Sequence, residues 1–243
     1  METAYYDTLH GMQAQHWWYE ARRRILRSVL QGIFDEGVPT GVLYDLGCGV
    51  GANLPVLEQF GETLGIDTSP EAVAYCRENG HANVRVSDLN RLDGLPDNSA
   101  SVVVLADVIE HLENEGPCLA SALRLLKPGG ALVVTVPAFM FLWSPADDLA
   151  HHYRRYTRAQ LKRIIDRHAQ VKTLTYFNTI LFPPVVAGRL LEKVLNRKGD
   201  DTAGVPPRPV NELLTRVFAL ESSCIGRINL PFGVSLLCIA RAG

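Results

Sequence analysis

Glycines and a carboxylate carry the chemistry that is most readily read from this sequence. The stretch VLYDLGCGVGANL (42–54) places Gly47, Gly49 and Gly51 between a strand-like run and a helix-like segment. Such a turn lets the backbone pass close to a ligand, where a Cβ would clash. Asp45 stands just before the turn, and its carboxylate would repel a pyrophosphate but suits a ligand with ammonium and sulfonium groups. The third glycine comes one residue too early for the dinucleotide fingerprint GxGxxG, which disfavours an NAD-dependent dehydrogenase.

Three further aspartates follow Asp45 at intervals of 22, 21 and 19 residues, namely Asp67, Asp88 and Asp107. Each falls at the carboxyl end of a predicted parallel strand, the edge at which open α/β sheets bind their ligands. Asp67 is placed to hold both hydroxyls of a ribose, and Asp88 to accept a hydrogen bond from an exocyclic amine. The spacing therefore predicts a nucleoside-binding edge.

Alternating strand-like and helix-like segments must position these residues. An amphipathic helix opens the chain, with apolar side chains at Ile25, Leu26, Val29, Leu30 and Ile33. Ser69 and Pro70 are typical of a helix start, and Thr157 of an N-cap. The order of the segments predicts an α/β, doubly wound, mostly parallel sheet with helices on both faces.

The motifs DLGCGVG (45–51), GIDTSP (65–70), SDL (87–89), LADVIEHL (105–112) and LKPGGALVVTVP (126–137) resemble those of class I S-adenosylmethionine (SAM)-dependent methyltransferases. The match is similar to the branch that methylates small molecules or lipids in ubiquinone-type pathways. The resemblance implies SAM as cofactor and a seven-stranded sheet of order 3-2-1-4-5-7-6 whose last strand is antiparallel. The cofactor-binding residues that it implies are Asp45, Gly47, Cys48, Gly49, Gly51, Asp67, Thr68, Asp88, Leu89, Asp107 and Val108.

We expect a single methyltransferase domain over 1–243. We expect an N-terminal helical lid in 1–40, a SAM-binding core in 41–177, a helical insertion or substrate cap in 178–232 and the last strand in 233–243. Trp18, in the aromatic run before three arginines, is a candidate for contact with the substrate under such a lid.

Two constellations could serve the methyl acceptor. In the first, DVIEHL, a helical start would place Asp107, Glu110 and His111 on one face. We expect no bound metal, although the resemblance leaves Asp107, Glu110 and His111 open as an alternative divalent-cation site. His111 is a candidate base, and packing over the cofactor is the structural alternative.

The second constellation is 151–168, where six basic residues stand against one aspartate. His152 and His151 are candidate bases, because a neutral imidazole can take a proton near pH 7. Tyr153 and Tyr156 could orient the acceptor. Arg154 and Arg155 could bind an anionic group on it, since guanidinium groups bind carboxylate or phosphate bidentately. A solvated helix face explains part of the charge equally well.

The composition excludes several classes of protein. Of 243 residues, 47% are hydrophobic and 21% charged, and the net charge is −2, which argues against a disordered chain and against nucleic-acid binding through overall charge. Five scattered cysteines without metal spacing indicate reduced thiols in the cytoplasm. We expect no spanning helix, while the Trp- and Arg-rich N-terminus leaves a peripheral membrane contact open.

These observations predict an enzyme that transfers a methyl group from SAM to an oxygen or nitrogen of a small-molecule or lipid-like acceptor bearing an anionic group. The alternative is a non-catalytic SAM-binding regulatory or partner subunit, because a fold alone does not guarantee chemistry.

Overall fold

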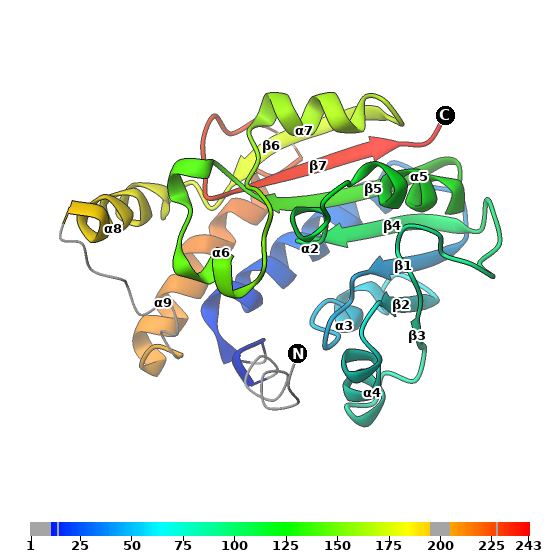
Figure 1. Cartoon of the computed structure of the whole chain (residues 1–243), viewed down its shortest axis with the longest axis horizontal. Helices are drawn as coiled ribbons and strands as arrows, with labels where there is room; N and C mark the ends of the chain where they lie inside the picture. Colours follow the sequence, from blue (N-terminus) through cyan, green and yellow to red (C-terminus); the bar gives the residue numbers. More distant parts are fainter. Residues whose placement is uncertain (1–10, 14, 195–204, 227) are drawn as a thin grey trace.

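A computed structural model describes residues 11–13, 15–194, 205–226 and 228–243 of the chain (Figure 1). Parts of the predicted lid (1–10 and 14) and of the predicted insertion (195–204 and 227) lie outside the described residues. One seven-stranded sheet forms the centre. Its strands are β1 (Val42–Leu46), β2 (Thr63–Asp67), β3 (Val84–Val86), β4 (Ala100–Ala106), β5 (Leu126–Pro137), β6 (Gln170–Phe177) and β7 (Ser235–Arg241).

The strand order is β3-β2-β1-β4-β5-β7-β6, which confirms the predicted topology. Strands β1 to β5 pair in parallel, whereas β7 runs antiparallel to both β5 and β6. The order reverses between β1 and β4, so their carboxyl ends form the crevice at which doubly wound sheets bind ligands.

Helices cover both faces of the sheet (Figure 1). Their bounds are α2 (Trp17–Asp35), α3 (Leu54–Leu57), α4 (Pro70–Glu78), α5 (Gly116–Leu125), α6 (Pro145–Leu149), α7 (Arg158–Ile165), α8 (Phe182–Val194) and α9 (Arg208–Ala219), with short 3₁₀ turns η1 (Ile109–His111), η2 (Met140–Leu142) and η3 (Leu220–Ser223). The side chains of β4 alternate between the faces: Val102 and Val104 pack with α2, and Val103 and Leu105 with α5 and α7.

Local sequence signals explain where several helices begin. Ser69 caps α4, its Oγ accepting the amide of Ala72 at 3.2 Å, as predicted. Thr157 and Gln160 form a capping box at the start of α7. The glycine loop is followed only by the short α3, because the chain turns again soon after Leu57. The helix expected there is thus shorter than its apolar pattern suggests.

The segment between β6 and β7 adds α8, α9 and η3. Helix α9 packs along α2, where Trp17 and Trp18 contact Phe218. Glu221 ties η3 to the end of β6 by accepting the amides of Thr179 and Ile180 at 2.7 and 2.9 Å. No helix among the described residues is long and apolar enough to cross a membrane. The five cysteines are all described, and all are free thiols.

Candidate functional site

The glycine loop follows β1 and lies against the end of β4. Gly47, Gly49 and Gly51 all have positive φ angles, of 76°, 54° and 87°, which L side chains rarely adopt. A Cβ on Gly47 would lie 2.6 Å from Val108 Cγ2, whereas a Cβ on Gly49 would meet nothing within 4 Å. Gly47 therefore allows close packing inside the protein. Gly49 leaves open space on the side from which a ligand can approach.

Asp67, at the end of β2, holds the loop in place. Its Oδ2 accepts the amide of Gly49 at 2.8 Å, and its Oδ1 accepts the amide of Ser69 at 2.9 Å. Each oxygen keeps further acceptor capacity, so the carboxylate can still receive hydrogen bonds from ligand hydroxyls. Thr68 beside it is exposed.

Asp45 is buried, with 1% of its surface exposed. Neither of its carboxylate oxygens has a hydrogen-bond partner in the described structure. Burial, and then the negative charge of Asp67, raise the pKa of Asp45 to about 7, while Asn53 acts in the opposite direction. An unpaired buried carboxylate is costly unless a cation neutralises it. A ligand with an ammonium or sulfonium group would supply that charge.

The predicted adenine side lies after β3. Asp88 is exposed, and its Oδ1 accepts the amide of Asn90 at 2.9 Å, while Leu89 is buried. Cys48 is a buried loop residue next to Cys76; this contact and burial raise the pKa of its thiol. Cys48 is therefore an uncharged packing residue at the loop, without the features of an activated nucleophile.

Asp107 adopts a positive φ of 57° at the end of β4. Its carboxylate is paired with Arg22 of α2, and its Oδ1 accepts the hydroxyl of Thr135 at 3.1 Å. Arg22 also donates to Thr135 Oγ1 at 3.0 Å and lies over the ring of Trp18. A long cationic side chain from the N-terminal helix thus reaches the sheet edge.

Sequence reasoning missed Arg22, although a signal was present. Arg22 lies three and four positions before Ile25 and Leu26, on the apolar face of α2 that packs on the sheet. An arginine on the buried stripe of a helix must find a partner, whereas Arg24 on the same helix is exposed.

Turn η1 begins two residues after Asp107. Glu110 is fully buried, and neither of its carboxylate oxygens has a partner in the described structure. Burial, and then the charge of Asp107, raise its pKa well above the usual range. Desolvation of the ring and the neighbouring His152 lower the pKa of His111, although the residue as a whole is exposed.

Metal-ligating atoms of Glu110, His111 and His152 all lie within 4.8 Å of one another. This set could hold a divalent cation. It differs from the alternative set predicted from the sequence, because Asp107 is engaged by Arg22 and Thr135 and His152 takes its place.

His152 comes from the segment after β5, and its ring packs edge-on against that of His111 with centroids 4.5 Å apart. The backbone amide of Tyr153 donates to the carbonyl of Glu110 at 2.8 Å, which fixes this segment to η1. The side chain of Tyr153 is exposed. His151 is exposed and has a φ of 55°, so the two predicted histidines have different surroundings.

The remaining acceptor candidates have partners within the protein. Arg154 Nη1 donates to Glu115 at 2.6 Å, and Arg155 grips Asp147 through Nε and Nη2 at 2.8 and 2.7 Å. The guanidinium groups of both arginines are thus already hydrogen-bonded within the protein. The sequence had suggested that they would bind an anionic group of the acceptor. Tyr156 is buried, and its hydroxyl donates to the carbonyl of Ile109 at 3.3 Å. This contact gives Tyr156 a packing role between the two segments.

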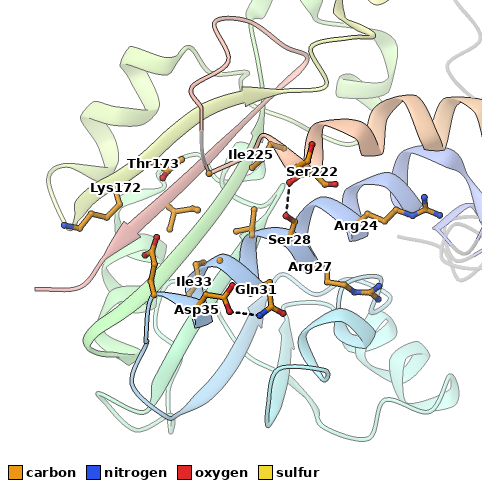
Figure 2. A pocket seen from close by; sticks show the side chains of 16 residues that line it. Arg24, Arg27, Ser28, Gln31, Ile33, Asp35, Lys172, Thr173, Ser222 and Ile225 are labelled. Atoms are coloured by element: carbon orange, nitrogen blue, oxygen red, sulfur yellow. Dashed lines mark hydrogen bonds between the residues drawn. The ribbon is translucent and has the colours of Figure 1, made fainter.

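A separate open cavity of about 560 Å³ lies between α2, η3 and the outer strands, and contains none of the predicted site residues. Figure 2 shows Lys172 extending away from Arg24 and Arg27, so its basic side chains do not converge. The convergent polar groups of the described chain are instead those at the β1–β4 edge.

The sheet order and the acid-lined glycine loop together define a class I methyltransferase architecture. Residues 44–134 match the family model of the methyltransferase domain. Residues 44–134 thus form a methyltransferase domain, and the sheet around them has the class I architecture, with SAM as the cofactor. The buried carboxylate of Asp45 and the open space at Gly49 fit this cationic cofactor.

Curated relatives agree with this assignment. A probable S-adenosylmethionine-dependent methyltransferase of Mycolicibacterium smegmatis is 26% identical over 65% of this chain and 61% of its own length. An uncharacterized 37.1 kDa protein in transposon TN4556 of Streptomyces fradiae is 36% identical over 58% of this chain and 43% of its own length. A ubiquinone biosynthesis O-methyltransferase of Bradyrhizobium is 29% identical over 38% of each chain. The chain thus spans less than two thirds of these relatives.

Solved structures show the same fold. A chain from the complex between the Haloferax volcanii Trm112 methyltransferase activator and its methyltransferase partner has a TM-score of 0.60 at 18% identity, covering 99% of this chain and 96% of that chain. A SAM-dependent methyltransferase from Archaeoglobus fulgidus has a TM-score of 0.56 at 21% identity, covering 90% of this chain and 94% of that chain. At these identities the likeness concerns the fold alone.

Proposed function

We propose that the chain transfers a methyl group from SAM to an oxygen or nitrogen atom of a small-molecule or lipid-like acceptor. The observation that carries the proposal is the buried, unpartnered carboxylate of Asp45 beside the glycine loop. An unpaired buried carboxylate destabilises the cofactor-free protein, whereas a cationic cofactor would pair with it and offset that cost.

The structure supports a specific placement of the cofactor. Asp67 would receive the ribose hydroxyls, with Thr68 beside the base, and Asp88 and Leu89 would border the adenine. The open side of Gly49 would face the cofactor. Arg22 would bind the methionine carboxylate in exchange for its present partners Asp107 and Thr135, because it is the basic side chain that the described structure places at the end of β4.

When bound, SAM supplies an electrophilic methyl group, so the protein must align the acceptor and remove a proton from it where the nucleophile is a hydroxyl. His111 lies in η1 after β4, and the ring of His152 packs against it. Either imidazole could accept the proton of the acceptor hydroxyl. His151 and Tyr153 lie further out, on the exposed side of the same segment.

The surroundings favour an acceptor with an apolar body. Large apolar side chains are exposed close to this segment, including Met140, Phe141 and Leu149. The arginines that would have recognised an anionic group are already paired. These contacts favour a lipid-like acceptor over one that is recognised through an anionic group.

A peripheral membrane contact fits the same picture. Helix α8 projects from the body of the protein (Figure 1) and exposes Leu190 and Leu191, while α9 exposes Val210 and Leu213. Apolar side chains on projecting helices are typical of surfaces that lie in a lipid interface. A lipid-like acceptor could then be taken directly from the bilayer.

Titration calorimetry with SAM and with its demethylated product tests the cofactor, and both should bind with affinities in the micromolar range or better. Incubation of a metabolite or lipid extract with SAM, followed by mass spectrometry, should reveal a product heavier by one CH₂. Binding without any product would indicate a non-catalytic SAM-binding subunit. Absence of binding by either ligand would contradict the proposal as a whole.

A further inference from the structure

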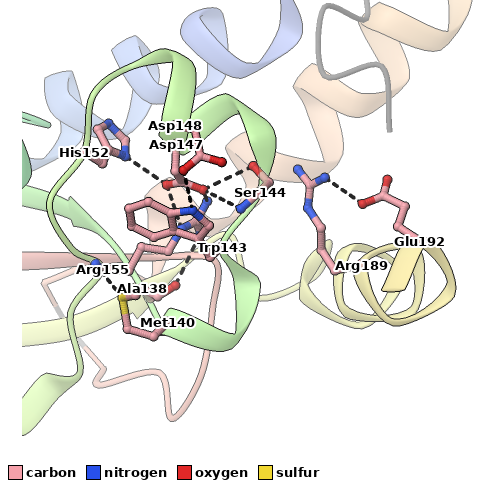
Figure 3. A network of polar contacts seen from close by, with 10 residues as sticks. All are labelled: Ala138, Met140, Trp143, Ser144, Asp147, Asp148, His152, Arg155, Arg189 and Glu192. Carbon is pink, nitrogen blue, oxygen red and sulfur yellow. Dashed lines mark hydrogen bonds and ion pairs between the residues drawn. The ribbon is translucent and has the colours of Figure 1, made fainter. Parts of the chain in front are cut away.

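Asp147 of α6 stands at the centre of a dense polar network (Figure 3). Only 1% of its surface is exposed. Its Oδ2 accepts the amide and the hydroxyl of Ser144 at 2.8 and 3.1 Å and Nη2 of Arg155 at 2.7 Å. Its Oδ1 accepts Nε of Arg155 at 2.8 Å and lies 2.8 Å from Nδ1 of His152. Few carboxylates in the described chain are held by so many donors.

These partners keep Asp147 ionised. The guanidinium of Arg155, which is always protonated, donates to both carboxylate oxygens, and Ser144 donates two more hydrogen bonds to Oδ2. An ionised carboxylate can only accept hydrogen bonds. The nitrogen that faces it, Nδ1 of His152, must therefore carry the hydrogen.

The tautomer of His152 follows. With the hydrogen on Nδ1, a neutral ring has its basic lone pair on Nε2. The amide of His152 also donates to the carbonyl of Asp147 at 2.9 Å, so both the backbone and the ring are fixed to the same residue. His111 has no hydrogen-bonded carboxylate of this kind in the part of the chain that the structure describes. The two paired imidazoles are thus chemically distinct.

We propose that Asp147 is a positioning residue that makes His152 the general base for methylation of an acceptor hydroxyl. This inference rests on the proposed function and narrows its acceptor to a hydroxyl compound. The acceptor oxygen forms a bond to the methyl carbon as the carbon–sulfur bond of the cofactor breaks, and the hydroxyl proton passes to Nε2 of His152. The products are the methyl ether, the neutral demethylated cofactor and an imidazolium, which Asp147 stabilises until the proton leaves to water.

Arg155 acquires a role in this arrangement. Its bidentate grip fixes the plane of the Asp147 carboxylate and, with Ser144, leaves one position open toward the imidazole. The groups that face His152 are Asp147 and Arg155 from its own segment and Glu110 and His111 from η1. Arg155 would therefore act on the acceptor indirectly, by holding Asp147, which in turn orients His152.

The first experiment uses the 243-residue chain with its sequence unchanged and needs no acceptor. Long-range ¹H–¹⁵N NMR spectra of histidine-labelled protein should show His152 as the Nδ1–H tautomer at neutral pH, and Asp147→Asn should abolish that preference. Asp148→Asn is the matched control, because Asp148 is the exposed neighbour and, among the residues that the structure describes, its side chain accepts a hydrogen bond from Trp143 and not from His152. An Nε2–H tautomer in the natural chain would overturn the proposal even if the variant failed to fold.

The second experiment measures turnover with deuteromethyl-SAM and the extract fraction that yields the methylated product. General-base catalysis contributes on the order of 10²–10⁴-fold, so Asp147→Asn should lower kcat by roughly 100-fold or more. The affinity for SAM and the kcat of Asp148→Asn should change less than roughly threefold. A kcat of Asp147→Asn within threefold of the natural chain would contradict the inference while leaving SAM binding intact.

A chelator arm separates a metal site from a base. Treatment with EDTA should leave kcat unchanged if His152 acts as the base. Loss of activity that Mn²⁺ or Zn²⁺ restores would overturn the inference and assign Glu110, His111 and His152 to a cation. Failure of SAM to bind in any of these preparations would instead contradict the proposed function.

Discussion

Arg22 of the N-terminal helix is paired with Asp107 at the end of β4, and the same guanidinium donates to Thr135 on β5. Two residues separated by 85 positions in the sequence thus meet at the edge where the cofactor is proposed to bind. The pair joins helix α2 to the sheet. It also places a positive charge beside negative ones. The methionine part of SAM carries both an ammonium group and a carboxylate, and these would need partners of both signs.

Replacement of Arg22 by Gln should weaken SAM binding. Charge-assisted hydrogen bonds contribute about 1.5–3 kcal/mol, so we expect Kd to rise by roughly 10- to 100-fold in calorimetry. Arg24→Gln is the control, because Arg24 is exposed on the same helix and is paired with Glu20, away from the glycine loop. Equal affinities of the two variants would show that Arg22 serves the helix and not the cofactor.

Asp67→Ala should have two effects. It removes the proposed ribose partner, and it also removes the acceptor for the amides of Gly49 and Ser69. We expect Kd for SAM to rise by at least roughly tenfold, and the free energy of unfolding to fall by about 1–2 kcal/mol. Glu71→Ala, at the second position of α4, should leave the affinity unchanged. An unaltered affinity in Asp67→Ala would refute the placement of the ribose.

The glycines offer a matched pair of substitutions. Gly49→Ala introduces a side chain at a φ of 54° but into open space. The free energy of unfolding should therefore fall by only about 1–2 kcal/mol. The affinity for SAM should fall sharply, because the new methyl group would occupy space that faces the cofactor. Gly47→Ala places a Cβ 2.6 Å from Val108 Cγ2, and overpacking should destabilise the fold by roughly 2 kcal/mol or more. Urea unfolding and calorimetry separate the two losses. The reverse pattern would mean that the cofactor does not approach Gly49.

Asp45 predicts an unusual dependence of stability on pH. Its folded pKa of about 7 lies above the usual value of 3.8. Its contribution to stability is therefore complete below the unfolded pKa and is lost as the pH rises through about 7. Asp45→Asn should remove this loss, so the cofactor-free variant should be more stable than the natural chain at pH 8 by roughly 1–3 kcal/mol.

The same variant should bind SAM at least roughly tenfold more weakly, because it lacks the charge that the cofactor neutralises. Thermal unfolding between pH 5 and pH 8 with and without SAM measures both effects. Asp35→Asn, an exposed carboxylate on α2, serves as control. A natural chain whose stability does not fall over this pH range would contradict an unpaired, ionisable Asp45.

The sheet topology could be predicted because its determinants are local. Apolar runs, the glycines of the loop and the aspartates at strand ends each report on their own segment, and their order along the chain fixes the doubly wound arrangement. The caps at Ser69 and Thr157 are local in the same way.

The pairing of charges could not be predicted in this manner. Arg154 and Arg155 belong to a basic segment, yet the carboxylate that engages Arg154 is Glu115, on the opposite side of β5 in the sequence. Arg22 finds Asp107 across a still longer interval. The net charge of segment 151–168 can be counted from the sequence, but the partners that its arginines find on folding cannot. The expected anion site depended on that net charge alone.

Residues 139–155 leave the sheet and return to it at one point. Ala138 and Tyr156 form a parallel bridge, the amide of Phe139 donates to the carbonyl of Tyr156, and the amide of Tyr156 donates to that of Pro137, both at 2.9 Å. The excursion that carries Asp147 and His152 is thereby closed at its neck. We therefore expect this segment to tolerate changes in length and sequence more readily than β5 or α7, which would let one core serve the methylation of different acceptors.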